Sequence, residues 1–405
     1  MTAAETTVAA QRAEAGWLHD LRADWEHRLA ETPRPTGLEE EWRRTSLDAL
    51  SWAAADAAEA PRTTHELPAH LAEAGVVFGD LADVARDQPQ LVQRYLGRGQ
   101  TLDSHAHFWA LAQARWSGGT FLYVPRGVIV DETLVARLDL GAAMASFPVS
   151  LVVAEEGSSV AMLEEIRSDD GVPAWYGGIA DVVAGQGSRV RYASLQRLGD
   201  AAWNLGAQRV EVGQDAEVTT LNAEVGSAIT KLGVEVRMAG KGGTSRVLGL
   251  LAAGGSQHID INSVQDLIAS HTTSDLLYLS ALYDQARAAF YGVTRVRHEA
   301  KSTSSYQECR NLLLSPEAGA EPIPVLEIET NDILRCGHGA TAGAIDPTQR
   351  FYAQSRGLPA EEAERMIVRG FFEQVVAQIS SEQIRSAVLG ALASRIGSAD
   401  EEVAA

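Results

Sequence analysis

Apolar residues recur at helical spacing near the start of the chain. Over residues 8–31, the apolar positions that repeat are Trp17, Leu18, Leu21, Trp25 and Leu29. This spacing predicts a helix, which Pro33 and Pro35 end because proline lacks the backbone N–H that a helix needs. A second helical region is expected over residues 38–109, interrupted by prolines, and its aromatic side chains are interpreted as core residues.

From about residue 118 the pattern changes to short alternating segments. Residues 234–238 (VEVRM), 258–262 (HIDIN) and 326–329 (LEIE) alternate apolar with polar positions, which predicts strands with one buried face. Corners of small residues precede strands at 157–160, 187–190 and 214–218, so the pattern recurs every 28 to 30 residues. This recurrence favours a stacked structure such as a parallel β-helix, although a large sandwich or barrel fits the same alternation.

Helical periodicity returns at about residue 359, and no helix is expected between residues 118 and 359. One apolar stripe comprises Ala363, Met366, Ile367, Phe371, Val375 and Ile379. Ser380 and Ser381 can cap a following helix that carries Ile384, Val388, Leu392 and Ile396. We therefore expect a helical region over 1–117, a β core over 118–355, a C-terminal helical region over 356–398 and an acidic tail over 399–405.

Composition excludes several classes of protein. The 405-residue chain has a formal net charge of −20, so phosphate backbones should repel it and nucleic acid is not an expected partner. Its two cysteines cannot form a disulfide framework or a multi-cysteine zinc site. The first residues lack the basic and apolar stretches of a signal peptide, and no segment has the length and apolarity to span a bilayer. These features predict a soluble cytoplasmic protein.

Motifs for common enzymatic chemistry are missing from the sequence. No phosphate-binding loop occurs, so the chain is not expected to bind a nucleotide. Neither a nucleophile-elbow serine motif nor an H-E-x-x-H zinc motif is present. The expectation is a protein that is not itself an enzyme.

The densest candidate for chemistry lies near residue 336. Cys336 and His338 are two residues apart, so on a strand their side chains share one face. A thiolate and an imidazole suit Fe, Zn or Cu(I), but two donors cannot complete a four-ligand site without another residue or chain. An incidental pair, with His338 hydrogen-bonded in a corner, is the structural alternative. Cys309 is by itself more typical of a small buried side chain than of a ligand.

Several linked motifs resemble the SufD family. Residues 336–346 (CGHGATAGAID) resemble its C-S-H-G-A-T-x-G-x-x-D signature, and residues 351–357 (FYAQSRG) resemble the F-Y-L-x-S-R-G that follows. Residues 311–315 (NLLLS) and 324–328 (PVLEI) match stretches just upstream, and residues 41–45 (EWRRT) resemble an N-terminal E-x-W-x-x-T. Gly337 stands in place of the usual serine. The strong match covers about residues 255–380.

The resemblance implies a mostly β protein: a right-handed parallel β-helix flanked by helical ends, acting as a scaffold in iron–sulfur cluster assembly. It implies a heterodimer with a SufB-like subunit, docking of a SufC-like ATPase on the C-terminal region, and a transient Fe–S cluster at the interface with the partner subunit. The implied metal-associated residues are His338, Cys336 and Cys309, with His338 foremost. Asp332 or Glu327 is expected to accept a hydrogen bond from the second ring nitrogen of His338.

Three alternatives remain open. A SufB-like identity is favoured by Cys309, which falls where SufB carries its cluster-associated cysteine, whereas SufB resembles H-E-A-T at the position of residues 338–341. A β-helix enzyme acting on polysaccharides needs paired carboxylates and a sugar-binding groove, and the aromatic content of 6% is low for that purpose. A structural interaction module with inert cysteines is the third.

Overall fold

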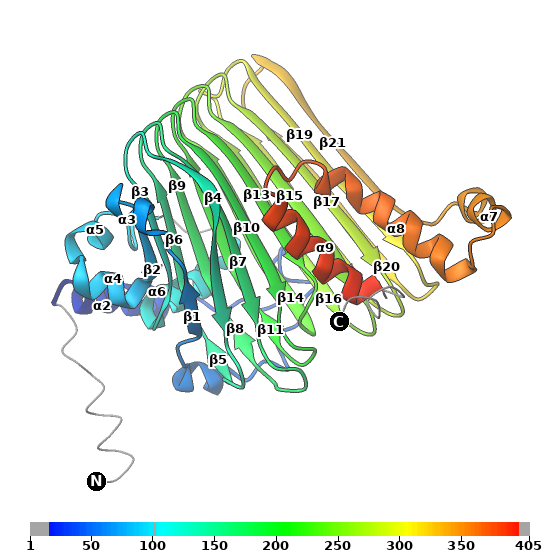
Figure 1. Ribbon diagram of the computed structural model, residues 1–405, viewed down its shortest axis with the longest axis horizontal. Helices are drawn as coiled ribbons and strands as arrows, with labels where there is room; N and C mark the ends of the chain where they lie inside the picture. Colours follow the sequence, from blue (N-terminus) through cyan, green and yellow to red (C-terminus); the bar gives the residue numbers. More distant parts are fainter. Residues whose placement is uncertain (1–15, 100–102, 397–405) are drawn as a thin grey trace, which may run out of the picture.

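The computed structural model describes residues 16–99 and 103–396, and its core is a parallel β-helix with helices at both ends of the chain (Figure 1). The predicted fold class is therefore confirmed. The predicted helix over 8–31 is described from Gly16, and the acidic tail predicted over 399–405 lies outside the described residues. No helix of the described residues combines the length and the hydropathy needed to cross a membrane.

The strands of the described residues form two long sheets that wind around a common interior. Sheet A has nine strands in the order β1-β4-β7-β10-β13-β15-β17-β19-β21, and sheet B has twelve. All neighbours are parallel except that β1 pairs with β4, and β2 with β3, in antiparallel fashion. The sheet A strands are β1 (Arg62–His65), β4 (Ile129–Asp139), β7 (Ser159–Arg167), β10 (Arg189–Arg197), β13 (Glu217–Glu224), β15 (Thr244–Ala253), β17 (Thr273–Leu282), β19 (Thr303–Leu313) and β21 (Ile333–Ala344).

Sheet B lies across the interior from sheet A and ends at β20. Its strands are β2 (Val77–Asp80), β3 (Gly119–Val124), β5 (Ala145–Ser146), β6 (Val149–Ala154), β8 (Trp175–Tyr176), β9 (Ile179–Ala184), β11 (Trp203–Asn204), β12 (Ala207–Val212), β14 (Ile229–Met238), β16 (His258–Leu267), β18 (Arg287–Val296) and β20 (Gly319–Ile328).

The predicted spacing between corners equals the number of residues in one coil of the β-helix. Register partners Ser159, Arg189, Glu217, Thr244, Thr273 and Ser304 on successive sheet A strands are 30, 28, 27, 29 and 31 residues apart. The small-residue corners lie at the turns before β7, β10 and β13. Gly157 and Asp215 there have φ of 69° and 52°, a region that glycine enters freely and that aspartate tolerates better than most residues. The small residues at the corners therefore indicate the length of one repeat.

Alternation correctly identifies the buried inward face of β14 and β16, whereas in the third predicted segment, at the end of β20, Ile328 is 43% exposed. Val234, Val236 and Met238 of β14 are buried in the interior cluster, and so are Ile259 and Ile261 of β16. The outward positions Asp260 and Asn262 are also buried, contrary to the simple alternating pattern, because the N-terminal region covers that part of sheet B.

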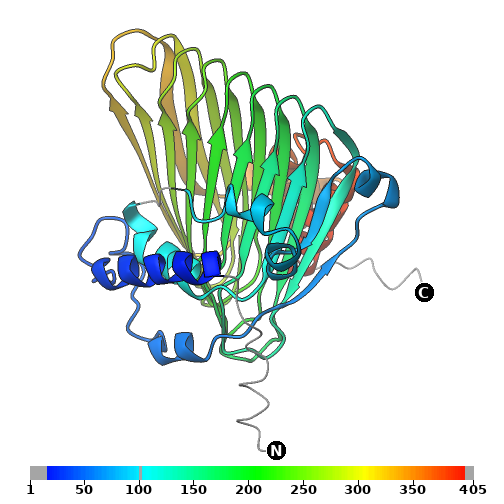
Figure 2. The same ribbon diagram turned by 90° about the vertical axis from the view of Figure 1, so that its left-hand side faces the viewer.

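The N-terminal region is less helical than predicted. Besides its helices, it contributes β1 and β2 to the two sheets (Figure 2). The helical elements are α2 (Gly16–Glu31), η1 (Trp52–Ala57), α3 (Ala69–Glu73), α4 (Leu81–Asp87), α5 (Pro89–Gln93), η2 (Asp103–His105) and α6 (Ala106–Arg115). Trp42, Trp109 and Trp116 are buried in one cluster with Leu151 of β6 and Trp175 of β8, so the aromatic residues form a core as predicted.

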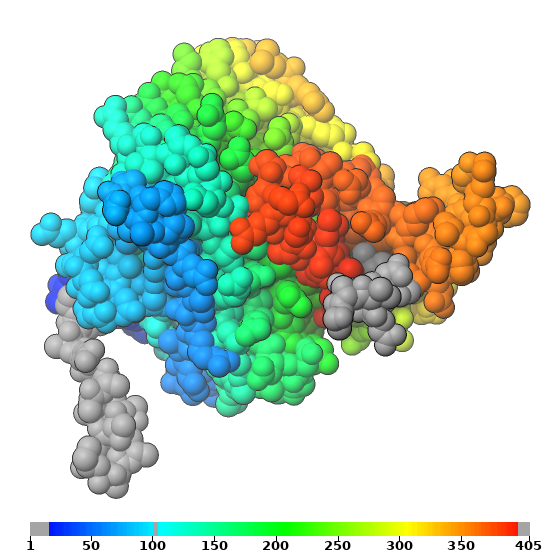
Figure 3. All heavy atoms as spheres, viewed as in Figure 1, coloured from blue at the N-terminus to red at the C-terminus, as the bar shows by residue number. Residues whose placement is uncertain are grey.

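The C-terminal helices are α7 (Pro347–Ser355), α8 (Ala360–Val376) and α9 (Glu382–Ile396). Helices α8 and α9 cover the outer face of sheet A, whereas α7 extends away from the β-helix (Figure 3). Val368, Phe372 and Val375 of α8 pack against strand residues such as Leu250 and Leu279. Helix α7 begins before residue 359, contrary to the prediction. The Asp346 side chain accepts from Thr348 N and proline occupies the first turn, which is a helix start signal that does not depend on apolar periodicity.

Candidate functional site

The last coil of the β-helix carries the predicted site residues. Strands β20 and β21 end their sheets, and each pairs with one neighbour, β18 and β19 respectively, among the described residues. Their inward-facing side chains are consequently not covered by a further coil. Pro322 and Pro324 in β20 suit such a position, since proline is tolerated on edge strands.

Cys336 and His338 both lie on β21 and share its inward face. Cys336 is the register partner of Ser305, and His338 is the register partner of Gln307. Cys309 follows Gln307 by two residues on β19 and lies opposite Ala340, so it belongs to the same face. The structure therefore brings all three predicted residues to the open end, on two adjacent strands.

Cys309 is fully enclosed beneath the last strand. Its thiol is in the interior cluster, and burial raises its pKa to about 12 although a hydrogen bond with Asn311 opposes the shift. The Asn311 amide donates both to Cys309 Sγ, at 3.6 Å, and to the Thr341 carbonyl oxygen of β21, at 2.9 Å. In this state Cys309 is a neutral thiol enclosed in the interior cluster.

Cys336 is half-buried, and the side chain of His338 is exposed. Burial raises the pKa of the Cys336 thiol. The glycines beside His338 face the opposite side of the strand, where Tyr306 packs: a Cβ on Gly339 would lie 3.1 Å from the Tyr306 hydroxyl. Arg335 stacks over the same ring at 4.4 Å. These glycines thus accommodate Tyr306 of this chain.

The donor set at the open end is incomplete for a metal centre within the residues that the structure describes. In residues 16–99 and 103–396, no group of three or more His, Cys, Asp or Glu side chains is arranged to hold a metal ion. The expected contact from Glu327 to His338 is not formed; Glu327 instead accepts from Arg295 Nε at 2.5 Å. Asp332 is joined through its backbone to Ser302 N.

The N-terminal EWRRT motif fastens its segment to the middle of sheet B. Lys231 of β14 is fully buried and donates from Nζ to Asp260 Oδ2 at 2.7 Å and to the Glu41 carbonyl oxygen. Thr45 donates to the same Asp260 carboxylate at 2.7 Å, and the Trp42 ring lies 5.2 Å from Lys231 Nζ. Sequence reasoning missed Lys231 and Asp260, because neither residue signals burial by itself.

Three large apolar side chains are exposed on the C-terminal helices, where α7 extends away from the β-helix (Figure 3). They are Phe351 and Tyr352 of α7 and Met366 of α8, which are 71%, 61% and 51% exposed. We call these three residues the helical patch. The stripe predicted from the sequence is thus divided: Val375 is buried on sheet A, whereas Met366 points to solvent.

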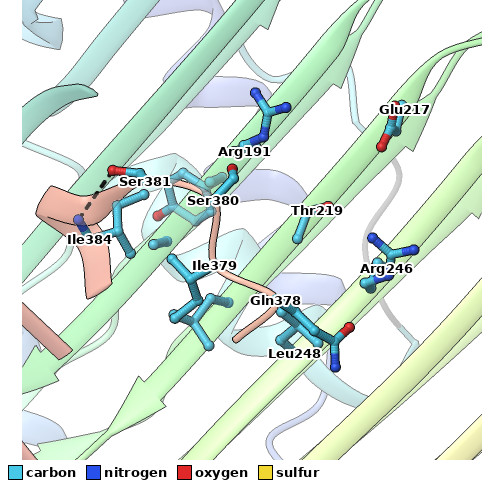
Figure 4. A pocket seen from close by; sticks show the side chains of 13 residues that line it. Arg191, Glu217, Thr219, Arg246, Leu248, Gln378, Ile379, Ser380, Ser381 and Ile384 are labelled. Atoms are coloured by element: carbon cyan, nitrogen blue, oxygen red, sulfur yellow. Dashed lines mark hydrogen bonds between the residues drawn. The ribbon is translucent and has the colours of Figure 1, made fainter. Parts of the chain in front are cut away.

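A surface pocket of about 200 Å³ lies where the connection between α8 and α9 crosses sheet A (Figure 4). Arg191, Glu217 and Arg246 reach it from three successive strands, and Ser381 accepts from Ile384 N at its edge. Its lining contains both positively and negatively charged side chains and lies on the outer face of the β-helix. It therefore has no part in the inward-facing cysteine and histidine positions.

Comparison with known proteins gives a consistent result along the chain. Residues 137–371, more than half of the chain, match a family model described as SUF system FeS cluster assembly, SufBD core domain, and residues 22–135 match the SufBD protein N-terminal region. Curated relatives are the iron–sulfur cluster assembly SufBD family proteins of Staphylococcus saprophyticus, at 27% identity, and Staphylococcus epidermidis, at 28%. Each alignment spans 320 residues, which is 78% of this chain and 68% of the relative.

Proposed function

Because the chain belongs to the SufBD family of iron–sulfur cluster assembly proteins, we propose that it is a non-catalytic scaffold subunit of a cytoplasmic SUF complex. The observation that carries the proposal is the open last coil, where Cys336 and His338 share one face beside the buried Cys309. The Fe–S cluster is cargo on this scaffold.

Within the family, we propose a SufD-like identity. The support is the sequence CGHGAT over residues 336–341, which keeps the SufD-type histidine followed by Gly339-Ala340-Thr341. Cys309 is the feature that favours a SufB-like identity. Its enclosure and its raised pKa are consistent with a structural thiol in the SufD-like alternative. His338 is therefore assigned the leading role in handling iron or sulfide.

A SufB-like subunit is proposed to bind at the open end. Strand edges with free backbone groups pair readily with another chain, and β20 and β21 present ten- and twelve-residue strands there. Leu334 and Ile328 of these strands are exposed apolar side chains that a partner can bury. The partner would also complete the donor set that this chain leaves short, so the cluster forms at the interface and only transiently.

A SufC-like ATPase is proposed to dock on the helical patch. Exposed aromatic and methionine side chains grouped on helices are typical of surfaces that bind another protein. Phe351, Tyr352 and Met366 lie outside the contacts that hold α8 on sheet A, so they are available to a partner while the fold stays intact. The nucleotide belongs to the ATPase in this proposal.

Anaerobic reconstitution with iron and sulfide tests the scaffold function. The isolated chain, the SufB-like subunit and their complex are each incubated with both ions, and cluster absorption is recorded. We expect an absorption band on the complex that exceeds the sum of the two separate subunits. A complex that forms but shows no more cluster than its separated subunits contradicts the scaffold role of this chain.

A further inference from the structure

The interior of the β-helix contains a buried carboxylate among hydroxyl groups. Glu164 of β7 is 1% exposed, and its Oε1 accepts from Thr120 Oγ1 at 3.0 Å and from Ser150 Oγ at 2.6 Å. Its Oε2 accepts from Tyr192 OH at 2.7 Å. Three O–H donors satisfy an ionised carboxylate, which only accepts hydrogen bonds.

A second carboxyl, that of Glu224 on β13, is equally buried. Its surroundings stabilise a negative charge less well than those of Glu164. Glu224 Oε2 accepts from Gln196 Nε2 at 3.0 Å and from Asn204 Nδ2 at 3.1 Å. Both donors are neutral amides. Within the described residues, no lysine or arginine forms an ion pair with Glu164 or Glu224, in contrast to the buried Asp181, which pairs with Arg209 at 3.1 Å.

The two carboxyls line one internal cavity of about 30 Å³, which is large enough for a water molecule. Gln208, also in its lining, accepts from Asn222 through Oε1, but its buried Nε2 has no hydrogen-bond partner among the described residues. Leaving a buried N–H unpaired is costly, so this donor calls for a water molecule in the cavity.

A hydrogen-bonded chain connects this interior with the surface. His65 of β1 is half-buried, and its Nε2 lies 3.2 Å from Thr120 Oγ1. Because the Thr120 hydroxyl donates its only proton to Glu164, the His65 Nε2 must be the donor in that contact. Proton transfer along His65, Thr120 and Glu164 is thereby possible without opening the β-helix.

We propose that the hydrated cavity is a proton-binding site, in which Glu224 takes up and releases one proton while Glu164 and Thr120 connect the cavity with His65 at the surface. The proposal is independent of the cluster-assembly role. Its ligands are a proton and the water molecule that pairs with Gln208.

The electrostatic setting agrees with this geometry. Burial raises the pKa of Glu224 to about 7, although the Asn204 and Gln196 hydrogen bonds oppose the shift. Burial also raises the pKa of Glu164 against its three hydrogen bonds. The tyrosines that face the two carboxyls from β8, β10 and β17 stay neutral because burial raises their pKa: Tyr176, Tyr192 and Tyr278. Burial lowers the pKa of His65.

The E224Q variant of the full chain tests the site through stability. In the unfolded chain the pKa of Glu224 takes its ordinary value of 4.5, so between about pH 4.5 and 7 only the folded state holds the proton. Wild-type folding therefore weakens as pH rises through this window, and the amide removes the effect. The folding constant of E224Q relative to wild type should rise on the order of 50-fold from pH 5 to 8.

The matched control is E217Q, the same change at an exposed position of the same strand β13. Its ratio to wild type should stay nearly constant with pH. If E224Q and E217Q give the same pH profile, Glu224 does not hold the proton and the proposal is overturned.

A measurement on the wild-type chain covers the case in which E224Q folds poorly. The infrared carbonyl band of a protonated carboxyl should disappear with a midpoint near pH 7. T120V, which removes the hydroxyl between His65 and Glu164, should keep this midpoint but slow the exchange of that proton for deuterium several-fold. If the band is absent at pH 6, the cavity does not hold the proton. If the exchange rate is unchanged in T120V, the proposed connection to the surface through Thr120 is wrong.

Discussion

Cys309 on β19 lies directly opposite Ala340 on β21, two residues from His338 along the same inward face. Cys309 is 3% exposed, and the Asn311 amide links Cys309 Sγ with the backbone of β21. Access to Cys309 therefore requires β21 to move, whereas His338 is already exposed. The three site residues are adjacent in space but differ in the conditions under which they can react.

We predict that His338→Ala leaves the fold and partner binding nearly unchanged. The side chain is exposed, so its removal should alter the free energy of unfolding by no more than about 0.5 kcal/mol. Cluster formation on the complex should fall at least several-fold, and Cys336→Ala should have a milder effect. Urea unfolding and anaerobic reconstitution measure the two effects.

Thr341→Ala is the control for this experiment, because Thr341 is an exposed residue of the same strand on its other face. It should assemble clusters at the wild-type rate. If the His338→Ala complex also does so, the assignment of His338 is wrong even though the family assignment stands.

We predict that the two cysteines react with a thiol reagent at very different rates. With a pKa of about 12 and full burial, Cys309 presents almost no thiolate near neutral pH, whereas Cys336 is half-buried at the edge. Iodoacetamide should modify Cys336 at least tenfold faster in the folded chain, as followed by peptide mass spectrometry. In urea the rates should converge, and fast labelling of Cys309 in the folded chain would contradict its enclosure.

Much of the β-helix could be predicted from the sequence because turn residues and alternating strand residues mark each repeat locally. Gly157 and Asp215 mark turns with positive φ, and Val234 with Val236 marks an inward face. The same logic placed Cys336 and His338 on one face, since strand side chains alternate. Local patterns were sufficient wherever structure depended on near neighbours along the chain.

Long-range contacts explain what the sequence analysis did not anticipate. Asp260 reads as a solvent-facing residue until residues 41–45 cover it, more than two hundred positions away in sequence. Val375 was grouped with Met366 in one stripe, yet of these two residues only Val375 packs on sheet A. The pairing of Cys309 with Ala340 likewise depends on the register between two strands whose paired residues are 31 positions apart in sequence.

We predict opposite outcomes for two phenylalanines of the C-terminal helices. Phe372→Ala should destabilise the chain by about 3 to 5 kcal/mol, because the ring is buried between α8 and sheet A. Phe351→Ala removes a 71% exposed ring from the helical patch, so it should change stability little but weaken ATPase co-purification. Equal ATPase binding by Phe351→Ala, Met366→Ala and wild type would argue against the helical patch as the docking surface.

The last prediction concerns the attachment of the N-terminal region. Lys231→Ala leaves the Asp260 carboxylate buried with Thr45 and without its cation, which should destabilise the chain by about 3 to 5 kcal/mol. The Glu41 carbonyl also loses a donor, so protease cleavage within residues 32–45 should accelerate. Lys241→Ala removes an exposed lysine and should stay within about 0.5 kcal/mol of wild type. Urea unfolding with limited proteolysis measures both effects. Equal stability of the two variants would show that the Lys231–Asp260 pair does not hold the EWRRT segment on sheet B.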